Sequence, residues 1–380
     1  MQGIVEILKG KLADMLETLK QIVEKESPTL DKELTDQLAS FIANLFEDLT
    51  SGKASIIQND LYGNHIRGEF GSGEEQILLL THYDTVWQKG DIKEKIPFKI
   101  EGDILYGPGV FDMKGGIVQG LYALQALKET NQFLNKKVVF LCTSDEELGS
   151  PSSQKLIEEE AKKSKYVLVL EPPISKQGAL KTARKGVGIF KLHIKGRAAH
   201  AGVEPEKGIS AILELSKQVT YLHELTDYSK GTTVNVGKIS GGTTVNVIAA
   251  EAEADIDLRV KTKAEFERII PIIKNLKPKT AGVDVKVAGG INRPPFERTD
   301  QVISLFNIAK KIARDHLGIN LEEKETGGGS DGNFTAPFAP TLDGLGAVGD
   351  GAHALNEHII ISEMPKRSAL LALLIKELAN

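Results

Sequence analysis

Hydrophobic residues recur at helical spacing through the N-terminal part of the chain. They alternate there with charged residues and fall at Ile4, Leu8, Leu12, Met15, Leu19 and Ile22. This pattern predicts an amphipathic helix rather than the uninterrupted apolar segment of a signal peptide. A second helix is predicted over residues 30–49, and the apolar stretch 369–375 is too short to cross a bilayer. We therefore expect a cytoplasmic protein with no membrane partner.

Short, continuous apolar runs follow, at residues 77–80, 138–141 and 167–170. Runs that are apolar on both faces and separated by helical segments, such as 117–128, are typical of buried parallel strands. The sequence thus predicts an α/β domain with a mixed, mostly parallel sheet flanked by helices. His82, the pair Glu146-Glu147 and Glu171 come directly after these runs. Ligands of such sheets bind at the carboxyl ends of the strands, so these side chains are candidates for chemistry.

The pattern changes between residues 184 and 294, where strand-like alternation returns. The predicted order is strand, helix, strand, strand, helix, strand, over residues 188–195, 209–225, 232–239, 245–260, 266–276 and 283–287. This order is that of a ferredoxin-like α+β unit. Because a further histidine motif follows at His353, we interpret the unit as an insertion. The expected domains are a catalytic domain in two parts, 1–183 and 295–380, and an inserted domain, 184–294.

Composition narrows the classes of function. A chain of 380 residues exceeds one ordinary hydrophobic core, in agreement with two domains. With 47 basic and 52 acidic residues the net charge is −5, which gives no attraction to nucleic acid. The single cysteine, Cys142, excludes an intrachain disulfide and a thiolate metal cluster, and its apolar neighbours indicate a buried strand position.

Five short motifs carry the candidate chemistry. They are His82-Tyr83-Asp84-Thr85, Gly109 to Gly116 around Asp112, Ser144 to Gly149 around Glu146-Glu147, Glu171-Pro172-Pro173 and Gly351-Ala352-His353. Imidazoles and carboxylates are the protein ligands of a divalent metal such as zinc where thiolates are lacking. These residues exceed what one tetrahedral zinc requires. The set therefore indicates two metal ions.

Each motif also has a simpler interpretation. Asp84 could fix the tautomer of a ligating His82 or be an ordinary loop residue beside it. Asp112 could bridge two metals or bond its own turn. The pair Glu146-Glu147 could supply one ligand and one general base, or could be two acids at a helix N-terminus.

Taken together in order, the motifs resemble those of the dinuclear zinc exopeptidase and deacylase family. That family includes glutamate carboxypeptidase, acetylornithine deacetylase, succinyl-diaminopimelate desuccinylase and aminoacylase. The resemblance implies that one zinc is held by His82 and Glu171, the other by Glu147 and His353, and that Asp112 bridges both. It also implies that Glu146 is the general base, that a cis peptide bond follows Asp112, and that cobalt or manganese can replace zinc.

The inserted domain carries matches of its own. His200, in Gly196-Arg197-Ala198-Ala199-His200-Ala201-Gly202, resembles the histidine of the family's lid, which reaches the active site of the partner subunit in dimeric members. The other matches, which resemble contacts to substrate carboxylate and carbonyl groups, are Asn246, Arg259, Gly327, Gly328 and Gly329. The resemblance implies a homodimer formed through this domain. Without the resemblance, the simpler interpretations are that His200 is a turn histidine and that Arg259 pairs with Asp257.

The resulting hypothesis is a two-zinc hydrolase that uses an activated water to cleave an amide bond next to an amino acid with a free carboxylate. The substrate would be a small peptide, as for a glutamate-type carboxypeptidase, or alternatively an N-acyl amino acid, as for a deacylase. A dinucleotide-dependent oxidoreductase is disfavoured because Gly107-Pro108-Gly109 and Gly186-Val187-Gly188 do not complete the glycine fingerprint. A binding protein on the same fold is the remote alternative.

Overall fold

The computed structural model describes residues 2–132 and 134–380, which form two compact units. The first unit comprises Met1–Ala183, Arg298–Glu325 and Ser330–Asn380, and the second comprises Arg184–Glu297 and Thr326–Gly329. Residues 295–297 and 326–329 were expected in the catalytic domain, and both stretches belong instead to the inserted unit. Phe296 and Arg184 exchange two backbone hydrogen bonds. The Lys185 N–H donates to the Thr326 carbonyl, and the Arg184 guanidinium donates to the carbonyls of Gly328 and Gly329.

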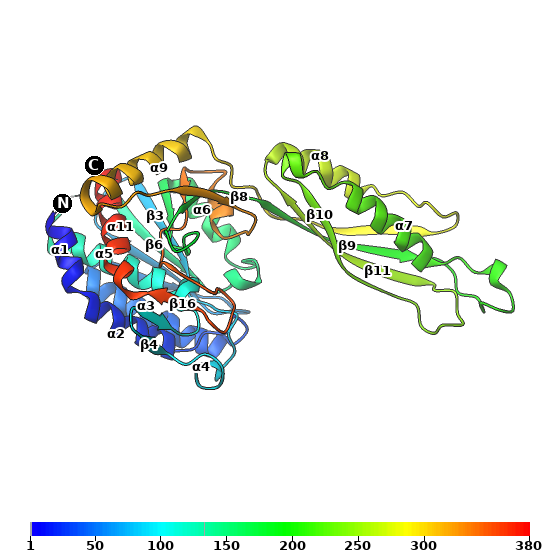
Figure 1. Cartoon of the computed structure of the whole chain (residues 1–380), viewed down its shortest axis with the longest axis horizontal. Coiled ribbons are helices and arrows are strands. Elements are labelled where there is room, and N and C mark those ends of the chain that lie inside the picture. Colours follow the sequence, from blue (N-terminus) through cyan, green and yellow to red (C-terminus); the bar gives the residue numbers. More distant parts are fainter. Residues whose placement is uncertain (1, 133) are drawn as a thin grey trace. The chain divides into compact units, whose positions relative to one another are not determined.

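The first unit is built on a six-stranded mixed sheet (Figure 1), which confirms the predicted α/β class. Neighbouring strands are β1 (Lys53–Ile57), β2 (His65–Phe70), β6 (Lys137–Thr143), β3 (Gln76–His82), β7 (Ser164–Val169) and β14 (Thr341–Leu342). β6, β3, β7 and β14 run parallel, whereas β1 and β2 are antiparallel to their neighbours.

Helices bury both faces of this sheet. One core contains alternate residues of the central strands and the helices α1 (Gln2–Gly10), α2 (Leu12–Glu24), α3 (Lys32–Thr50), α5 (Gly115–Glu129), α9 (Asp300–Ile312) and α11 (Met364–Ala379). The opposite core contains the other strand residues with α6 (Gln154–Lys163) and Phe334 of α10 (Gly332–Thr335). Because both faces are covered, every residue of β3 is buried, and the strand reads as a continuous apolar run. Cys142 is a buried residue of β6, as predicted, and burial raises the pKa of its thiol to about 12.

The N-terminal helix predicted over the first residues is divided in two. Residue Lys11 lies between α1 and α2, and its N–H donates to Leu8 O in a short three-residue step. Gly10 is a poor helix former, and both halves still bury their apolar residues. The remaining elements of this unit are short: α4 (Asp91–Glu94), β4 (Lys99–Glu101), β5 (Ile104–Tyr106), β8 (Leu180–Arg184), β13 (Glu323–Thr326), β15 (Gly349–Asp350) and β16 (His358–Ile360).

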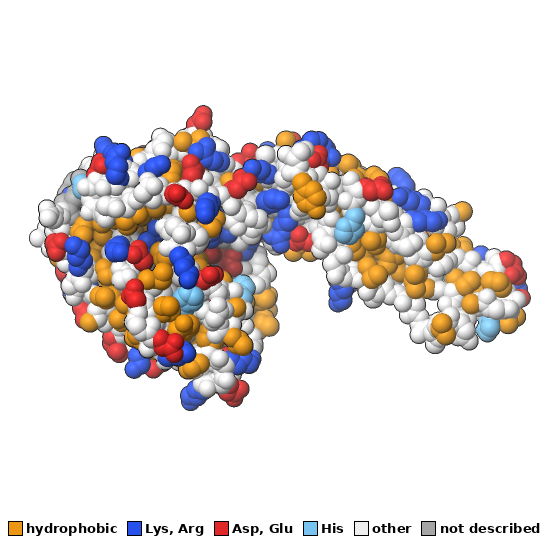
Figure 2. Space-filling view, viewed as in Figure 1, with side chains coloured by type: hydrophobic (Ala, Val, Ile, Leu, Met, Phe, Trp, Pro, Cys, Tyr) orange, Lys and Arg blue, Asp and Glu red, His pale blue; other side chains and the backbone are white. Residues whose placement is uncertain are grey.

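The second unit is a four-stranded antiparallel sheet with two helices, in the predicted ferredoxin-like order. Along the chain the elements are β9 (Gly186–Lys195), α7 (Ala211–Glu224), β10 (Thr233–Gly241), β11 (Glu251–Val260), α8 (Lys263–Lys274) and β12 (Asp284–Arg293), and the sheet order is β10-β11-β9-β12. β11 begins at Glu251 rather than at the predicted residue 245, since residues 243–250 form a loop. Hydrophobic side chains also reach the surface of this unit (Figure 2), among them Ile189, Ile212, Leu213, Ile239 and Val245.

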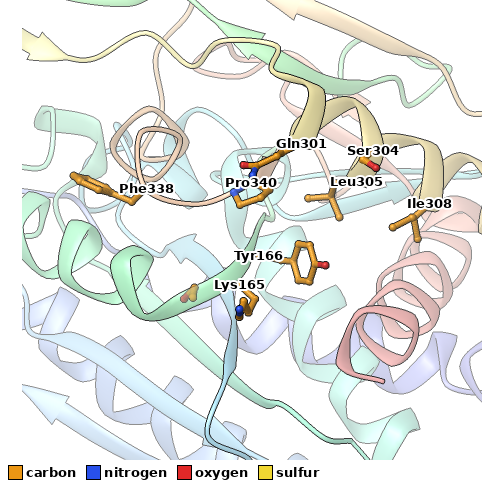
Figure 3. Close-up of a pocket in the computed structure, with 9 residues that line it drawn as sticks. Lys165, Tyr166, Gln301, Ser304, Leu305, Ile308, Phe338 and Pro340 are labelled. Carbon is orange, nitrogen blue, oxygen red and sulfur yellow. The ribbon is translucent and has the colours of Figure 1, made fainter.

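A cavity of about 450 Å³ lies between the start of β7 and helix α9. Lys165 and Tyr166 line it from the strand, Gln301, Ser304, Leu305 and Ile308 from the helix, and Phe338 and Pro340 from the chain before β14 (Figure 3). Glu171 follows the opposite end of β7. This cavity is therefore distinct from the candidate chemistry at the carboxyl ends of the strands. Within the described ranges, none of the helices combines the length and hydrophobicity needed to cross a bilayer.

Arg367 links the C-terminal helix α11 to the loops that surround it. Its guanidinium is buried and donates to the carbonyls of Gly178, Gly344 and Gly346, and burial lowers its pKa to about 10. We expect Arg367→Met to lower the free energy of unfolding by about 3 kcal/mol, because three carbonyls lose their donor. The neighbouring Lys366 is exposed and pairs only with Glu363 among the described contacts. Lys366→Met should therefore change the free energy of unfolding by less than about 0.5 kcal/mol. Equal urea midpoints for the two variants would contradict this assignment.

Candidate metal centre

The candidate ligands gather at the carboxyl ends of three adjacent strands. His82 is the last residue of β3, and it lies opposite Thr143, the last residue of β6, in the parallel register. The turn that carries Glu146 and Glu147 follows β6, and Glu171 comes just after β7. Because these strands are neighbours and run in the same direction, three segments distant in sequence deliver their polar residues to one edge of the sheet.

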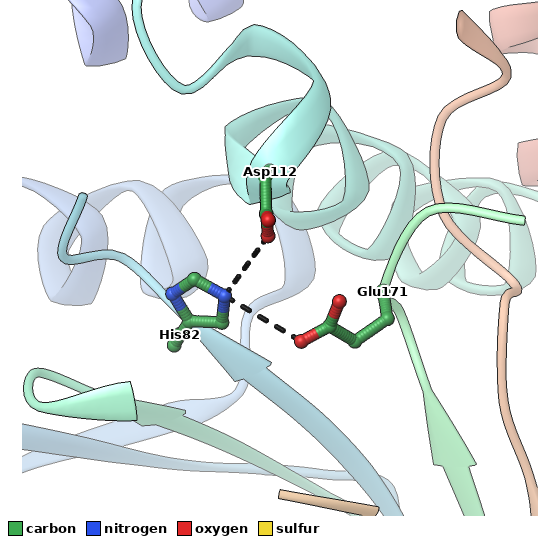
Figure 4. A group of neighbouring side chains, drawn as sticks. All are labelled: His82, Asp112 and Glu171. Atoms are coloured by element: carbon green, nitrogen blue, oxygen red, sulfur yellow. Dashed lines mark hydrogen bonds and ion pairs between the residues drawn. The ribbon is translucent and has the colours of Figure 1, made fainter. Parts of the chain in front are cut away.

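The first group of metal-ligand-type side chains is His82, Asp112 and Glu171 (Figure 4). His82 Nε2 lies 3.2 Å from Asp112 Oδ1 and 3.6 Å from Glu171 Oε1. Asp112 comes from the turn Val110–Lys114, which leads into α5. His82 and Glu171 are buried.

The second group is Asp112, Glu147 and His353. His353 Nε2 lies 3.3 Å from Asp112 Oδ2 and 3.1 Å from Glu147 Oε2. His353 lies in the turn between β15 and β16 and has a positive φ of 61°. Asp112 is therefore common to both groups, with one carboxylate oxygen facing His82 and the other facing His353.

Asp84 contacts both His82 and the turn that carries Glu146 and Glu147. Nδ1 of His82 is 3.1 Å from the Asp84 carbonyl oxygen and 3.3 Å from Asp84 Oδ1. The Asp84 carboxylate also accepts bonds from the N–H groups of Glu146 and Glu147, at 3.3 and 3.2 Å. These contacts leave Nε2 of His82 directed to the first group and attach the acidic turn to the loop after β3.

The adjacent glutamates differ in their place relative to the two groups. Glu147 belongs to the second group, whereas Glu146 belongs to neither of the two groups found among the described residues. Both lie in the short 3₁₀ turn Glu146–Leu148. One carboxylate in a ligand set with another adjacent to it is the arrangement that a metal hydrolase needs for a ligand and a base.

The charges of the two groups fit divalent cations. Hydrogen bonds to Asp112 and Glu147 raise the pKa of His353 to about 10, and Asp112, Asp84 and Glu171 raise the pKa of His82 although its burial opposes them. Burial raises the pKa of Glu147, whose Oε1 is buried without a hydrogen-bond partner among the described residues. Carboxylate oxygens and imidazole nitrogens directed at one another suit metals with nitrogen and oxygen ligands, zinc included.

Glu357, which lies outside the five motifs, holds the backbone of the Asp112 loop. It is buried, and its carboxylate accepts bonds from N–H groups of Gly109, Phe111 and Asp112 and from the Trp87 indole. In the sequence, the one indication of its role is that an acidic residue follows His353 at a distance of four positions. The cis peptide bond that the family resemblance implies is present between Asp112 and Met113.

In the inserted unit, His200 and Asn246 lie on adjacent loops. His200 forms an antiparallel bridge with Val247, and Ala201 N–H donates to the Asn246 carbonyl at 2.9 Å. Both side chains are exposed. The structure therefore brings these two predicted residues together.

Arg259 lies at the other end of β11 and is already paired. Its Nε and Nη2 donate to the Asp257 carboxylate at 2.9 to 3.1 Å, and its Nη1 lies 3.5 Å from the Gly327 carbonyl. Residues two apart on a strand share a face, which explains why Asp257 reaches the guanidinium. The structure thus has the pairing that was the alternative to a free substrate-binding arginine, and it places Gly327 of the predicted glycine loop beside it.

The chain is similar to known proteins over most of its length. The model of the peptidase family M20/M25/M40 matches residues 78–377. Carboxypeptidase G2 of Pseudomonas sp. (strain RS-16) is 33% identical over 373 residues, covering 96% of this chain and 89% of that protein. Succinyl-diaminopimelate desuccinylase of Rickettsia rickettsii (strain Sheila Smith) is 28% identical over 322 residues, or 78% and 82% of the two chains. The YXEP protein of Bacillus subtilis, described as a dinuclear metal-binding peptidase, shares the fold with a TM-score of 0.74 at 14% identity, covering 98% of this chain and 99% of that one.

Proposed function

This chain belongs to the peptidase family M20/M25/M40 and is a metal-dependent hydrolase, and we propose that it cleaves an amide bond next to an amino acid with a free carboxylate, using two zinc ions. The observation that carries the proposal is the shared position of Asp112. One of its oxygens faces His82 beside Glu171, and the other faces His353 beside Glu147. Two such groups joined by one carboxylate are what a pair of metal ions requires.

In the proposed reaction, His82 and Glu171 would hold one zinc ion, Glu147 and His353 would hold the other, and Asp112 would be shared by the two ligand groups. Bound there, the two ions would polarise the substrate carbonyl and lower the pKa of a water molecule. Glu146 takes the proton from the attacking water and returns it to the leaving nitrogen. Asp84 keeps the His82 ring in its ligating orientation through the contacts at Nδ1.

The substrate class rests on the inserted unit and on the relatives. We propose that Arg259, with the loop Gly327, Gly328 and Gly329, binds the substrate's carboxylate, because a planar guanidinium binds a carboxylate through two hydrogen bonds. Asn246 lies beside His200 at the other end of β11, and we propose that it contacts the substrate's carbonyl group from the partner subunit. The similarity to a carboxypeptidase over nearly the whole chain favours a C-terminal amino acid such as glutamate as the group released. Deacylation of an N-acyl amino acid is the second candidate, since a desuccinylase is also similar.

We further propose that the protein acts as a homodimer formed through the inserted unit, with His200 stabilising the oxyanion at the site of the other subunit. The nine residues of extended strand from Glu251 to Arg259 make eight steps and span about 26 Å, and His200 and Asn246 lie beyond the Glu251 end. A substrate that contacts both Arg259 and His200 would therefore contact residues of two different subunits. Exposed apolar side chains such as Ile212 and Ile239 provide a surface for this contact.

Substitution of the two adjacent glutamates separates their roles. Glu146→Gln should abolish turnover and leave the metal content near two ions per chain, because only the base is lost. Glu147→Gln should lower both, because a neutral amide is a weaker ligand. Turnover would be followed on an N-acyl glutamate and metal by atomic absorption. A Glu146→Gln protein that loses metal but keeps its activity per bound ion would reverse the two assignments.

Carboxylate recognition is tested with a substrate in free-acid and amidated forms. Wild-type protein should prefer the free acid, and Arg259→Met should lose on the order of 100-fold in kcat/KM on the acid and little on the amide. Arg268→Met is the matched control, since Arg268 pairs with Glu265 on α8 in a similar way. If Arg259→Met keeps the wild-type preference, the carboxylate is not bound by this residue.

The shared-site proposal predicts a dimer whose activity depends on His200. Sedimentation equilibrium should give twice the chain mass, and His200→Ala should be inactive on its own. Mixing equal amounts of His200→Ala and Glu146→Gln should restore up to about a quarter of wild-type activity, because half of the dimers are then mixed and each mixed dimer holds one intact composite site of two. A fully active monomer would contradict the proposal.

A further inference from the structure

Glu357 joins three segments that carry the candidate ligands. Its Oε1 accepts from the N–H groups of Phe111 and Asp112, at 3.0 and 3.1 Å. Its Oε2 accepts from the Gly109 N–H at 3.0 Å and from the indole of Trp87 at 2.7 Å. Trp87 lies in the loop that begins after His82, and Glu357 itself follows the turn of His353.

The Glu357 carboxylate accepts hydrogen bonds from the first N–H groups of the turn that carries Asp112. The turn Val110–Lys114 has non-helical backbone angles at Asp112 and Met113, and it starts after Gly109, whose φ is 72°. The first N–H groups of any helical segment have no carbonyl acceptor within that segment. Here a single buried carboxylate accepts from three of them.

A carboxylate matches this set of partners better than an amide does. Its two oxygens face four N–H donors, and a carboxylate offers about four acceptor positions and no donor. The amide of a glutamine has nearly the same shape, yet its NH₂ group would face two N–H donors whichever way it turned. The shorter side chain of aspartate would not reach all four.

We propose that Glu357 is a positioning residue for the metal pair: by fixing the backbone N–H of Asp112 it sets the carboxylate of Asp112 where both metal groups can share it. This inference rests on the proposed two-metal function. Groups that orient a ligand in this way typically change metal affinity by ten- to a hundred-fold. Glu357 touches no substrate in this scheme, so its effect on the reaction passes through the ligands that it positions, Asp112 above all.

Zinc binding to the metal-free protein tests the inference without any substrate. Equilibrium dialysis at stepped free Zn²⁺ should show two ions bound by the wild type, and Glu357→Gln should weaken at least one of them by roughly ten- to a hundred-fold. Glu160→Gln is the matched control. Glu160 is also a buried glutamate of the first unit and accepts from Gln76, Arg67 and Lys163, but it belongs to neither ligand group found among the described residues.

The control separates positioning from general loss of stability. Both variants should unfold at lower urea concentration than the wild type, and only Glu357→Gln should lose zinc affinity. Unchanged affinity in Glu357→Gln, or an equal loss in Glu160→Gln, would overturn the inference. If Glu357→Gln does not fold, Glu357→Asp is judged by the same criterion.

Failure of this inference can be told from failure of the proposed function. A wild-type protein that binds two zinc ions but hydrolyses no acyl amino acid or peptide would overturn the proposed reaction and leave the role of Glu357 standing. Unchanged zinc affinity in Glu357→Gln together with an active wild type would overturn the role of Glu357 and leave the proposed reaction standing. A wild type with no second zinc ion would overturn both.

Discussion

The parallel register of β3 with β6 and β7 is the constraint on which the site depends. His82 ends its strand opposite the last residue of β6, and β7 pairs with the other edge of β3. The strand ends are held at this spacing by backbone hydrogen bonds and by cores on both faces of the sheet. His82, Glu147 and Glu171 lie at or shortly after these strand ends, whereas Asp112 and His353 lie in loops. Asp84 attaches the Glu146-Glu147 turn to the loop after β3, and Glu357 holds the backbone of the Asp112 loop.

Much of this arrangement could be predicted from the sequence. The runs at 77–80 and 138–141 indicated strands buried on both faces because no polar residue interrupts them, and the position of His82 and Glu171 just after such runs placed them at one edge. The motifs resembled a known family closely enough to group the five ligand-type residues, and the structure brings these five together in two groups.

Other features could not be predicted, for identifiable physical reasons. The break between α1 and α2 leaves the apolar period intact, so periodicity alone does not show it. The loop 243–250 keeps the alternation of the strand that follows it. Glu357 is one acidic residue among many, and its role appears only when four N–H groups from distant segments converge on it. Residues 326–329 follow the catalytic part in sequence but are bonded to the inserted unit.

The pairing of Arg259 with Asp257 has a consequence for selectivity. A cation that already has a carboxylate beside it presents little net charge to an approaching ligand, so long-range attraction of anions is weak. Recognition would then be an exchange, in which a substrate carboxylate replaces Asp257 on the guanidinium while Asp257, which is partly exposed, returns to water. Such an exchange conserves the number of ion pairs and so depends little on ionic strength. It also favours ligands that match the geometry of the carboxylate they displace over ligands that are merely negative.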